Sequence, residues 1–459
     1  MIITALSTSS IFPFLYFMIR DFHIAKREED ISFYAGFIGC SLLVGRFLTS
    51  LLWGIVADRY GRKPVMIIGT MAVLIFNATF GLSKSYWMAI TSRFLLGACN
   101  GVIGPMRAYV TEVCRREHQP LGVSLIMSAW GIGLVIGPAI GGFLAQPAEK
   151  FPNVFSQESI FGRFPYFLAS LAISIYALFV FVICFWLPVC FLYCVPYRAV
   201  VECCLLLISK LLLQETLHSH SAEDKLGFND VEKSQSTESK SSNSSLTLLR
   251  NWPLMSMIIV FSIFQMHDTA YSEVFSLWAV SPRSLGGLSF STDNVGQALA
   301  AAGIGMLSCN LILYPALGIS LGPLTVTRTG AVLSILLLTC LPFTTNLRGV
   351  TLTLVIDLAS ILQNMFSCII SIGLFLQQNR AVSQEQRGAA NGIALSITSL
   401  CNAIGPAIAG TVLSWAQSRQ NASFLPGSHM VFFVLNMVKF IGLLMTFKPF
   451  LVKPAQEFD

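Results

Sequence analysis

Residues 53–64 read Trp-Gly-Ile-Val-Ala-Asp-Arg-Tyr-Gly-Arg-Lys-Pro and join two apolar runs, 32–56 and 65–83. Gly54 permits a close approach of two helices, and Gly61 permits a tight reversal of the chain. Asp58 places a carboxylate where three cations can neutralise it: Arg59, Arg62 and Lys63. A basic loop that only anchors two helices is the simpler alternative. Chance rarely places Gly, Asp, Gly and Arg together at this spacing, so the segment favours a specific helix hairpin with charges at its turn.

The composition outside this segment is that of a membrane protein. Of the 459 residues, 54% are hydrophobic and 11% are charged, whereas about a quarter of the residues in a soluble domain carry a charge. Mean hydropathy is +0.69, and apolar runs of about twenty residues recur, each long enough to cross the hydrocarbon layer. These runs must be helices, because lipid cannot satisfy backbone polar groups. The net charge of +6 is typical of cytosolic loops rich in Lys and Arg, not of nucleic-acid binding.

The runs predict an all-α polytopic membrane protein of about twelve helices in two halves of six. The first half, 1–188, has helices near 1–19, 32–56, 65–83, 87–110, 122–144 and 164–188. The second half, 254–449, has helices near 254–280, 294–316, 327–344, 350–376, 390–415 and 429–449. A cytosolic linker, 189–253, joins them; its polar part cannot bury enough apolar surface to fold. Residues 450–459 form a short cytosolic tail. Most of the twelve Cys lie in apolar runs, which predicts buried residues instead of disulfides or a metal site.

A motif of small residues recurs in the fifth helix of each half. The first copy is Gly137-Pro138-Ala139-Ile140-Gly141-Gly142, preceded by Gly133, and the second is Gly405-Pro406-Ala407-Ile408-Ala409-Gly410. The matching position and orientation indicate parallel repeats related by an axis along the membrane normal. Small residues let helices pack closely, so both copies are expected at helix contacts.

Ionisable residues inside apolar runs are candidates for transport chemistry, since lipid makes them costly. Arg93 lies in the fourth run. In the seventh, helical spacing places His267 and Tyr271 on one face with Asp268 beside them, while Glu273 points elsewhere. His267 can exchange protons near neutral pH. A structural ion pair of Arg93 and a packing cluster in the seventh helix remain the alternatives. His267 and Asp268 are adjacent and do not by themselves make a zinc site.

Three motifs resemble those of the major facilitator superfamily. Residues 53–64 are similar to its loop 2–3 signature, Arg93-Phe-Leu-Leu-Gly97 to its helix-4 motif, and the stretch from Trp130 to Gly142 to its antiporter-associated helix-5 motif. The resemblance implies the major facilitator fold, antiport, and a part for Arg93 in proton coupling, although tight packing alone also explains the helix-5 motif. It implies a conformational switch made of Gly54, Asp58, Arg59, Gly61, Arg62 and Lys63. We expect Asp58 to face the start of the eleventh helix, 388–391, where the helix dipole favours an anion.

Longer stretches resemble the plant zinc-induced facilitator-like family. They are residues 12–22, 141–150, 267–273, 386–392 and 424–433, and the resemblance covers nearly the whole chain except 189–214 and parts of the linker. It implies a proton-coupled carrier of the vacuolar or plasma membrane. Substrates in that family include metal chelators such as nicotianamine and phytosiderophores, and some members affect potassium and auxin transport. Arg93, His267, Asp268, Tyr271 and Glu273 are then candidates for proton coupling and the substrate cavity.

We therefore expect a proton-coupled antiporter of small organic solutes or metal chelators, linked to zinc homeostasis. A direct monovalent or divalent cation–proton antiporter is one alternative, although few carboxylates are available for it, and a non-transporting or defective family member is another. No nucleophile–base or metal constellation appears outside the membrane runs, so an enzyme is not expected. Neither a cofactor nor a bound metal is expected. The predicted partners are the substrate, protons and the lipid bilayer, and the chain is expected to act as a monomer.

Two features depart from the family pattern. Family members carry a cytosolic N-terminal tail with a Cys motif, whereas here Met1 already lies in the first predicted helix. Residues 189–214 separate Trp186-Leu187-Pro188 from Glu215-Thr216-Leu217-His218, which are contiguous in the family. A thirteenth span would invert the second half, so this apolar insert, with its charged edge of Arg198 and Glu202, is expected to lie in the cytosolic interface. The clean split is typical of a retained intron or a gene-model artefact.

Deleting residues 189–214 should therefore preserve or improve the amount of protein in the membrane and its transport rate. The deletion restores the contiguous family junction and removes an apolar surface that has no predicted helix partner. Membrane fractionation and uptake assays of both forms would measure this. Correctly inserted protein without transport would show that the insert belongs to the working transporter.

Overall fold

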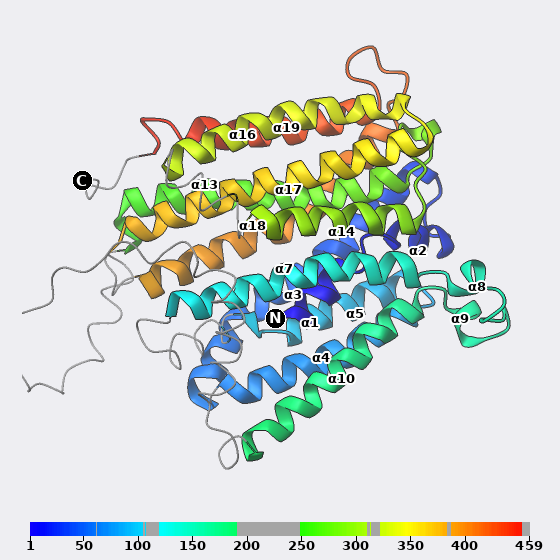
Figure 1. The fold of residues 1–459 in the computed structure, drawn as a ribbon, viewed down its shortest axis with the longest axis horizontal. Helices are drawn as coiled ribbons and strands as arrows, with labels where there is room; N and C mark the ends of the chain where they lie inside the picture. The colour runs from blue at the N-terminus through cyan, green and yellow to red at the C-terminus, as the bar shows by residue number, and fades with distance from the viewer. Residues whose placement is uncertain are drawn as a thin grey trace, which may run out of the picture.

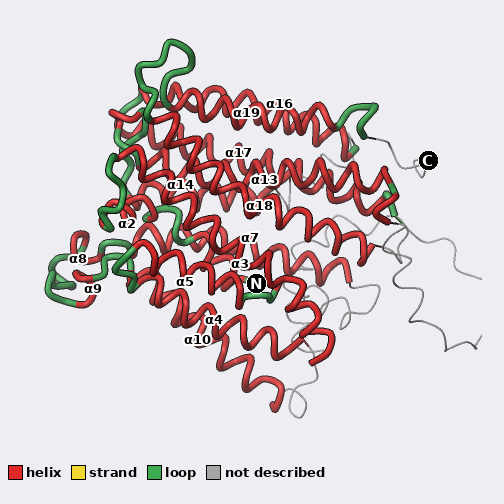
Figure 2. The backbone as a smooth tube through the Cα atoms, turned by 180° about the vertical axis from the view of Figure 1, so that it is seen from behind, coloured by secondary structure: helices red, strands yellow, loops and turns green. Residues whose placement is uncertain are grey.

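The computed structural model describes residues 1–60, 62–103, 106, 119–190, 248–309, 313, 322–382 and 387–451. Within these residues the chain consists of helices and loops, and no strand occurs (Figure 2). The longer helices of the first half are α1 (Ile2–Ser9), α2 (Leu15–Asp21), α3 (Ile31–Tyr60), α4 (Arg62–Gly81), α5 (Tyr86–Cys99), α7 (Gln119–Leu144) and α10 (Phe167–Cys190). Those of the second half are α13 (Trp252–Val280), α14 (Thr292–Ser308), α16 (Pro323–Cys340), α17 (Gly349–Arg380), α18 (Arg387–Gln417) and α19 (Ser428–Met445). Short helices occupy the connections: η1 (Glu28–Asp30), α8 (Pro147–Lys150), α9 (Ile160–Arg163), η3 (Arg283–Leu285) and η5 (Leu341–Asn346).

A helix lies at each of the twelve predicted positions, and seven helices of the described chain are long and apolar enough to cross a membrane. The polytopic all-α fold is confirmed. Two predicted helices differ in detail. The first is interrupted between Ser9 and Leu15, where Pro13 cannot donate a backbone hydrogen bond. The fourth ends at Cys99, because Asn100 leaves helical geometry with a ψ of 66°. The insert and most of the linker, residues 191–247, lie outside the described part of the chain.

The helices run side by side, with α4 and α10 of the first half lowest and α16 and α19 of the second half uppermost in Figure 1. The end of the bundle that carries α2, α8 and α9 is called the α8 end here. The predicted membrane orientation makes it the side opposite the cytosol. Helices α3 and α7 of the first half contact α18 and α14 of the second half, respectively. These two contacts join the halves.

Glycine pairs bring the backbones together at both contacts. A methyl group on Gly36 of α3 would lie 3.0 Å from the Cα of Gly410 in α18, and one on Gly142 of α7 would lie 2.9 Å from the Cα of Gly296 in α14. Neither distance leaves room for a side chain. Gly142 and Gly410 are the final glycines of the two copies of the repeated motif. The copies therefore occupy equivalent contacts, each against a helix of the opposite half.

The first glycine of each copy packs within its own half. Gly137 approaches α1, and a methyl group on it would lie 3.3 Å from the Leu6 carbonyl oxygen. Gly405 approaches α13, and a methyl group on it would lie 3.3 Å from the Met266 carbonyl oxygen. Gly133 and Gly141 also face the α1 segment. Pro138 and Pro406 both lie inside continuous helices. Small residues thus let α7 and α18 each contact a helix of their own half and a helix of the other.

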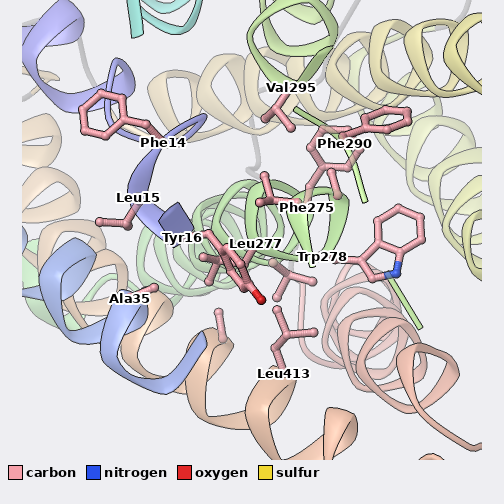
Figure 3. Packing of buried hydrophobic residues seen from close by; sticks show 14 of the residues in the cluster. Phe14, Leu15, Tyr16, Ala35, Phe275, Leu277, Trp278, Phe290, Val295 and Leu413 are labelled. Carbon is pink, nitrogen blue, oxygen red and sulfur yellow. The ribbon is translucent and has the colours of Figure 1, made fainter. Parts of the chain in front are cut away.

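Polar and apolar contacts reinforce the junction at the α8 end. Lys150 Nζ donates to the Gly142 carbonyl oxygen at 2.6 Å, to Thr292 Oγ1 at 2.8 Å and to Asp293 Oδ1 at 2.6 Å. At the other contact, Ser32 of α3 donates to Gln417 Oε1 at 3.1 Å. The largest apolar cluster includes residues of both halves, among them Phe14, Ala35, Phe275, Val295 and Leu413, and Figure 3 shows them converging.

Gly410→Ala should destabilise the fold by about 1–3 kcal/mol, because its methyl group meets the backbone of α3 and the helices must separate. Gly392→Ala is the matched control on the same helix, since no described atom lies within 4 Å of its methyl position. Thermal unfolding of the detergent-solubilised proteins should show a lower midpoint for Gly410→Ala alone. Equal midpoints for the two variants would contradict the tight contact.

Candidate functional site

Helix α13 carries four of the five predicted cavity residues. Asn251 caps its start by accepting a hydrogen bond from the Leu254 backbone N–H, and the helix continues for 29 residues. His267, Tyr271 and Glu273 are buried, whereas the Asp268 side chain is 21% exposed. Asp268 faces α17 and α19 of its own half, and Glu273 faces α3 of the other half. The helix therefore contributes to two separate polar sites.

The first site centres on the Asp268 carboxylate. Its Oδ1 accepts a hydrogen bond from Ser367 Oγ of α17 at 2.8 Å and lies 3.2 Å from His267 Nδ1. Lys439 Nζ of α19 lies 3.8 Å from the same oxygen. This carboxylate is thus a partly exposed anion held by three side chains of the second half.

Lys439 is fully buried behind Asp268, with an exposed side-chain fraction of 0%. Its Nζ donates to Ser334 Oγ of α16 at 2.6 Å, and Ser334 in turn donates to Gln363 Oε1 of α17 at 2.7 Å. Lys439 is not among the residues predicted from the sequence. The signal was available, because Lys439 is the one charged residue in the predicted helix 429–449 apart from its last turn, and a charge inside an apolar run is a functional candidate.

His267 orients one ring nitrogen toward Asp268 and leaves the other without a partner. Within the described residues no hydrogen-bonding group reaches Nε2, although the side chain is buried. His267 also lines a crevice between α13, α18 and α19 whose other lining residues are apolar. The Asp268 carboxylate is not among the residues that line this crevice.

The second site lies between the halves. Arg93 of α5 is fully buried, donates through Nη1 to the Ser7 carbonyl oxygen at 2.7 Å, and places its guanidinium carbon 4.3 Å from the centre of the Phe80 ring. Its Nε and Nη2 groups have no hydrogen-bond partner among the described residues. The site thus holds a buried cation with two N–H groups available.

Glu273 supplies a buried carboxyl group from the second half. A methyl group on Gly39 of α3 would lie 2.9 Å from Glu273 Oε2, so the absent side chain of Gly39 makes room for the carboxylate. Glu273 Oε1 is buried without a hydrogen-bond partner in the described chain. Arg93 and Glu273 interact electrostatically but do not reach ion-pair distance. A guanidinium and a carboxyl group from opposite halves therefore lie near each other without forming an ion pair.

Tyr271 lies between the two sites on α13. It is buried, its ring centre is 5.8 Å from that of Phe275, and its hydroxyl has no hydrogen-bond partner among the described residues. The expected common face with His267 brings both side chains into the interior. It does not bring them into hydrogen-bond contact within the described chain.

The predicted switch is described only in part. Arg59 and Lys63 are exposed at the end of α3 and the start of α4. Gly61 and the side chains of Asp58 and Arg62 lie outside the described residues. The predicted contact of Asp58 with α18 therefore stays a prediction. No described atom lies within 4 Å of a methyl group built on Gly54, so the close helix approach expected at Gly54 is not seen in the described chain. Likewise, no group of three His, Cys, Asp or Glu side chains gathers there as metal ligands.

Comparison with known proteins defines the class. The model of the Major Facilitator Superfamily matches residues 1–264. The D-xylose–proton symporter structure superposes with a TM-score of 0.68 at 15% identity, covering 99% of this chain and 96% of that one, which shows the shared fold. The matching superfamily and the structural neighbour are transporters, not enzymes.

Closer relatives narrow the family. Protein ZINC INDUCED FACILITATOR-LIKE 1 of Arabidopsis thaliana is 50% identical over 99% of this chain and 90% of its own length. Protein ZINC INDUCED FACILITATOR 1 of the same plant is 51% identical over 98% of this chain and 89% of its own. The chain therefore belongs to the zinc-induced facilitator-like family of major facilitator transporters, and it is a multi-pass membrane protein that binds small-molecule substrates.

Arg93→Lys should destabilise the folded protein by about 1–3 kcal/mol, because an ammonium cannot both donate to Ser7 and stack on Phe80 as the planar guanidinium does. Thermal unfolding measures the loss. Arg163→Lys, an exchange at the exposed last residue of α9, is the control and should leave the midpoint unchanged. A midpoint for Arg93→Lys equal to that of this control would show that the stacked geometry contributes nothing.

Proposed function

We propose that this protein is a proton-coupled antiporter of small organic solutes or metal chelators of the nicotianamine type. In this proposal it contributes to zinc and metal homeostasis and works as a monomer in the vacuolar or plasma membrane. The observation that carries the proposal is the Asp268 site, where a partly exposed carboxylate inside a membrane helix contacts His267 and lies near a buried Lys439. Ionisable groups in such positions mark proton and substrate pathways.

The arrangement of the two sites supports coupling between substrate binding and movement of the halves. Arg93 belongs to the first half and Glu273 to the second, so any relative motion of the halves changes their separation. Their unpartnered N–H groups and carboxylate oxygen suit a substrate that carries both an acidic and a basic group, as amino-acid-derived chelators do. The electrostatic gain of such contacts is large in a region of low dielectric constant.

Residues of the loop 2–3 signature complete the proposal. Gly54, Asp58, Arg59, Gly61, Arg62 and Lys63 are assigned the role of a conformational switch at the cytosolic end. Family membership supports the assignment, since the same signature occurs at the same place between the second and third helices. The packing glycines at the α8 end would act as the opposing contact.

A direct cation–proton antiporter is the second candidate. The observation that favours it is the exposed portion of Asp268, because a carboxylate open to the interior can bind a metal cation without a chelator. Zinc, potassium and sodium ions are therefore tested alongside the chelator. Loss of transport activity in every assay would instead favour the non-transporting alternative.

His267→Ala and Asp268→Asn should both lose accumulation driven by a pH gradient, because each removes a group that can exchange a proton. Proteoliposome uptake of labelled nicotianamine, free and zinc-bound, measures this with and without the gradient. Exchange of substrate at equal pH should persist in at least one variant. Glu158→Gln, at an exposed loop position, is the control. If uptake in both site variants depended on pH as in the wild type, the cluster of His267 and Asp268 would have a structural role only.

A further inference from the structure

Lys439 is a buried cation that depends on one reachable anion. The side chain is 0% exposed, and the Asp268 carboxylate 3.8 Å away is the only anion within 4 Å of it in the described chain. Burying an ammonium without a counter-charge is costly. Asp268 itself is partly exposed, so an incoming ligand can compete for it.

Few titratable groups face Lys439. From α13 it is faced by Asp268 and by His267, with which it interacts electrostatically. From α16 comes Ser334, whose hydroxyl accepts the Nζ hydrogen bond, and from α17 comes Gln363, which holds that hydroxyl. Ser334 and Gln363 are neutral, so they can orient the amine in either protonation state but cannot replace the lost negative charge.

We propose that Lys439 is the group that releases the coupled proton when a positively charged group of the substrate binds Asp268. This inference rests on the proposed function. It adds two points: the residue that exchanges the proton, and the positive charge of the substrate group that displaces Lys439 from Asp268. The displacing group is an ammonium of an organic solute or a metal cation, free or chelated. Asp268 then binds either Lys439 or the substrate cation, but not both.

The step balances in atoms and charge. The substrate cation takes the Asp268 carboxylate, and the Lys439 ammonium is left without a counter-ion. One N–H bond of the ammonium breaks, its electron pair stays on Nζ, and the proton passes to water in the interior. The neutral amine keeps its contact with Ser334. On the other side of the membrane the substrate leaves, and Lys439 takes up a proton again, so one positive charge exchanges for one proton.

Arginine distinguishes this mechanism from one in which Asp268 alone carries the proton. Lys439→Arg keeps the positive charge but does not release its proton at physiological pH. Lys439→Met removes the charge while conserving an unbranched side chain. Both variants should abolish the pH dependence of uptake if Lys439 carries the proton, whereas Lys439→Arg should preserve it if Asp268 does.

A measurement without substrate tests the ion pair itself. In Asp268→Asn the ammonium of Lys439 has lost its counter-ion, so the folded protein sheds the proton while the unfolded chain keeps it. Stability therefore rises with pH in this variant. The gap in unfolding midpoint between Asp268→Asn and Asp268→Asn/Lys439→Met should be large near about pH 6 and shrink toward about pH 9. His267 interacts electrostatically with Lys439, so the comparison is repeated with His267→Ala in both proteins, which removes the titration of His267.

Transport provides the second measurement, on full-length protein in proteoliposomes with labelled nicotianamine, free and zinc-bound. Lys439→Arg and Lys439→Met should lose about tenfold or more of the accumulation driven by a pH gradient, equivalent to about 1.4 kcal/mol of coupling. Exchange at equal pH should survive in Lys439→Met. Wild-type pH dependence in Lys439→Arg would overturn the inference.

The two measurements separate the possible failures. If the wild type accumulates no probe, the proposed function fails, and the unfolding data alone decide whether Lys439 depends on Asp268. A midpoint gap that does not change with pH would overturn the inference whatever the transport result. If Lys439→Met does not fold, Asp268→Asn/Lys439→Met and Lys439→Arg replace it in these comparisons.

Discussion

The contact of backbone with backbone at Gly36–Gly410 and Gly142–Gly296 is the constraint on which the arrangement of both sites depends. It sets the distance between α3 and α18 and between α7 and α14, and through α18 it sets where α13 lies. Because α3 comes this close, Glu273 can reach the space that Gly39 leaves open. The interior charges are thus positioned by residues that carry no charge and no side chain.

Because of this arrangement, the ionisable residues of α13 belong to two sites that respond differently to movement of the halves. The Asp268 site is complete within the second half, since His267, Ser367 and Lys439 all belong to it. Arg93 and Glu273 come from different halves, so they lie near each other only when the two halves are in contact. A rigid movement of one half against the other would leave the first site intact and change the second. One helix can therefore link local chemistry to the relative position of the halves.

Sequence reasoning predicted the helices well, because runs of about twenty apolar residues have few alternatives in lipid. It also found Arg93, His267 and Asp268, since a charge in an apolar run is rare. The same rule should have found Lys439. Ser334, Gln363 and Ser367 could not be found that way, because Ser and Gln are common in membrane helices and their role arises only from packing among α13, α16, α17 and α19. The interruption between Ser9 and Leu15 was not predicted, because residues 1–19 read as one apolar run; in the structure α7 comes close to the chain there, at Ser10.

The Asp268 carboxylate has an internal asymmetry with a kinetic consequence. Ser367 and His267 both bond to Oδ1, and Lys439 is nearest to that oxygen, while no hydrogen bond from the described chain reaches Oδ2. One oxygen is saturated by the protein and the other is free for an arriving group. In the proposed exchange an arriving cation approaches Oδ2, and the Lys439 contact at Oδ1 is lost as the cation takes over the carboxylate. Entry of the cation and departure of Lys439 are then steps at different oxygens of one carboxylate, so the two cations do not have to pass through one position.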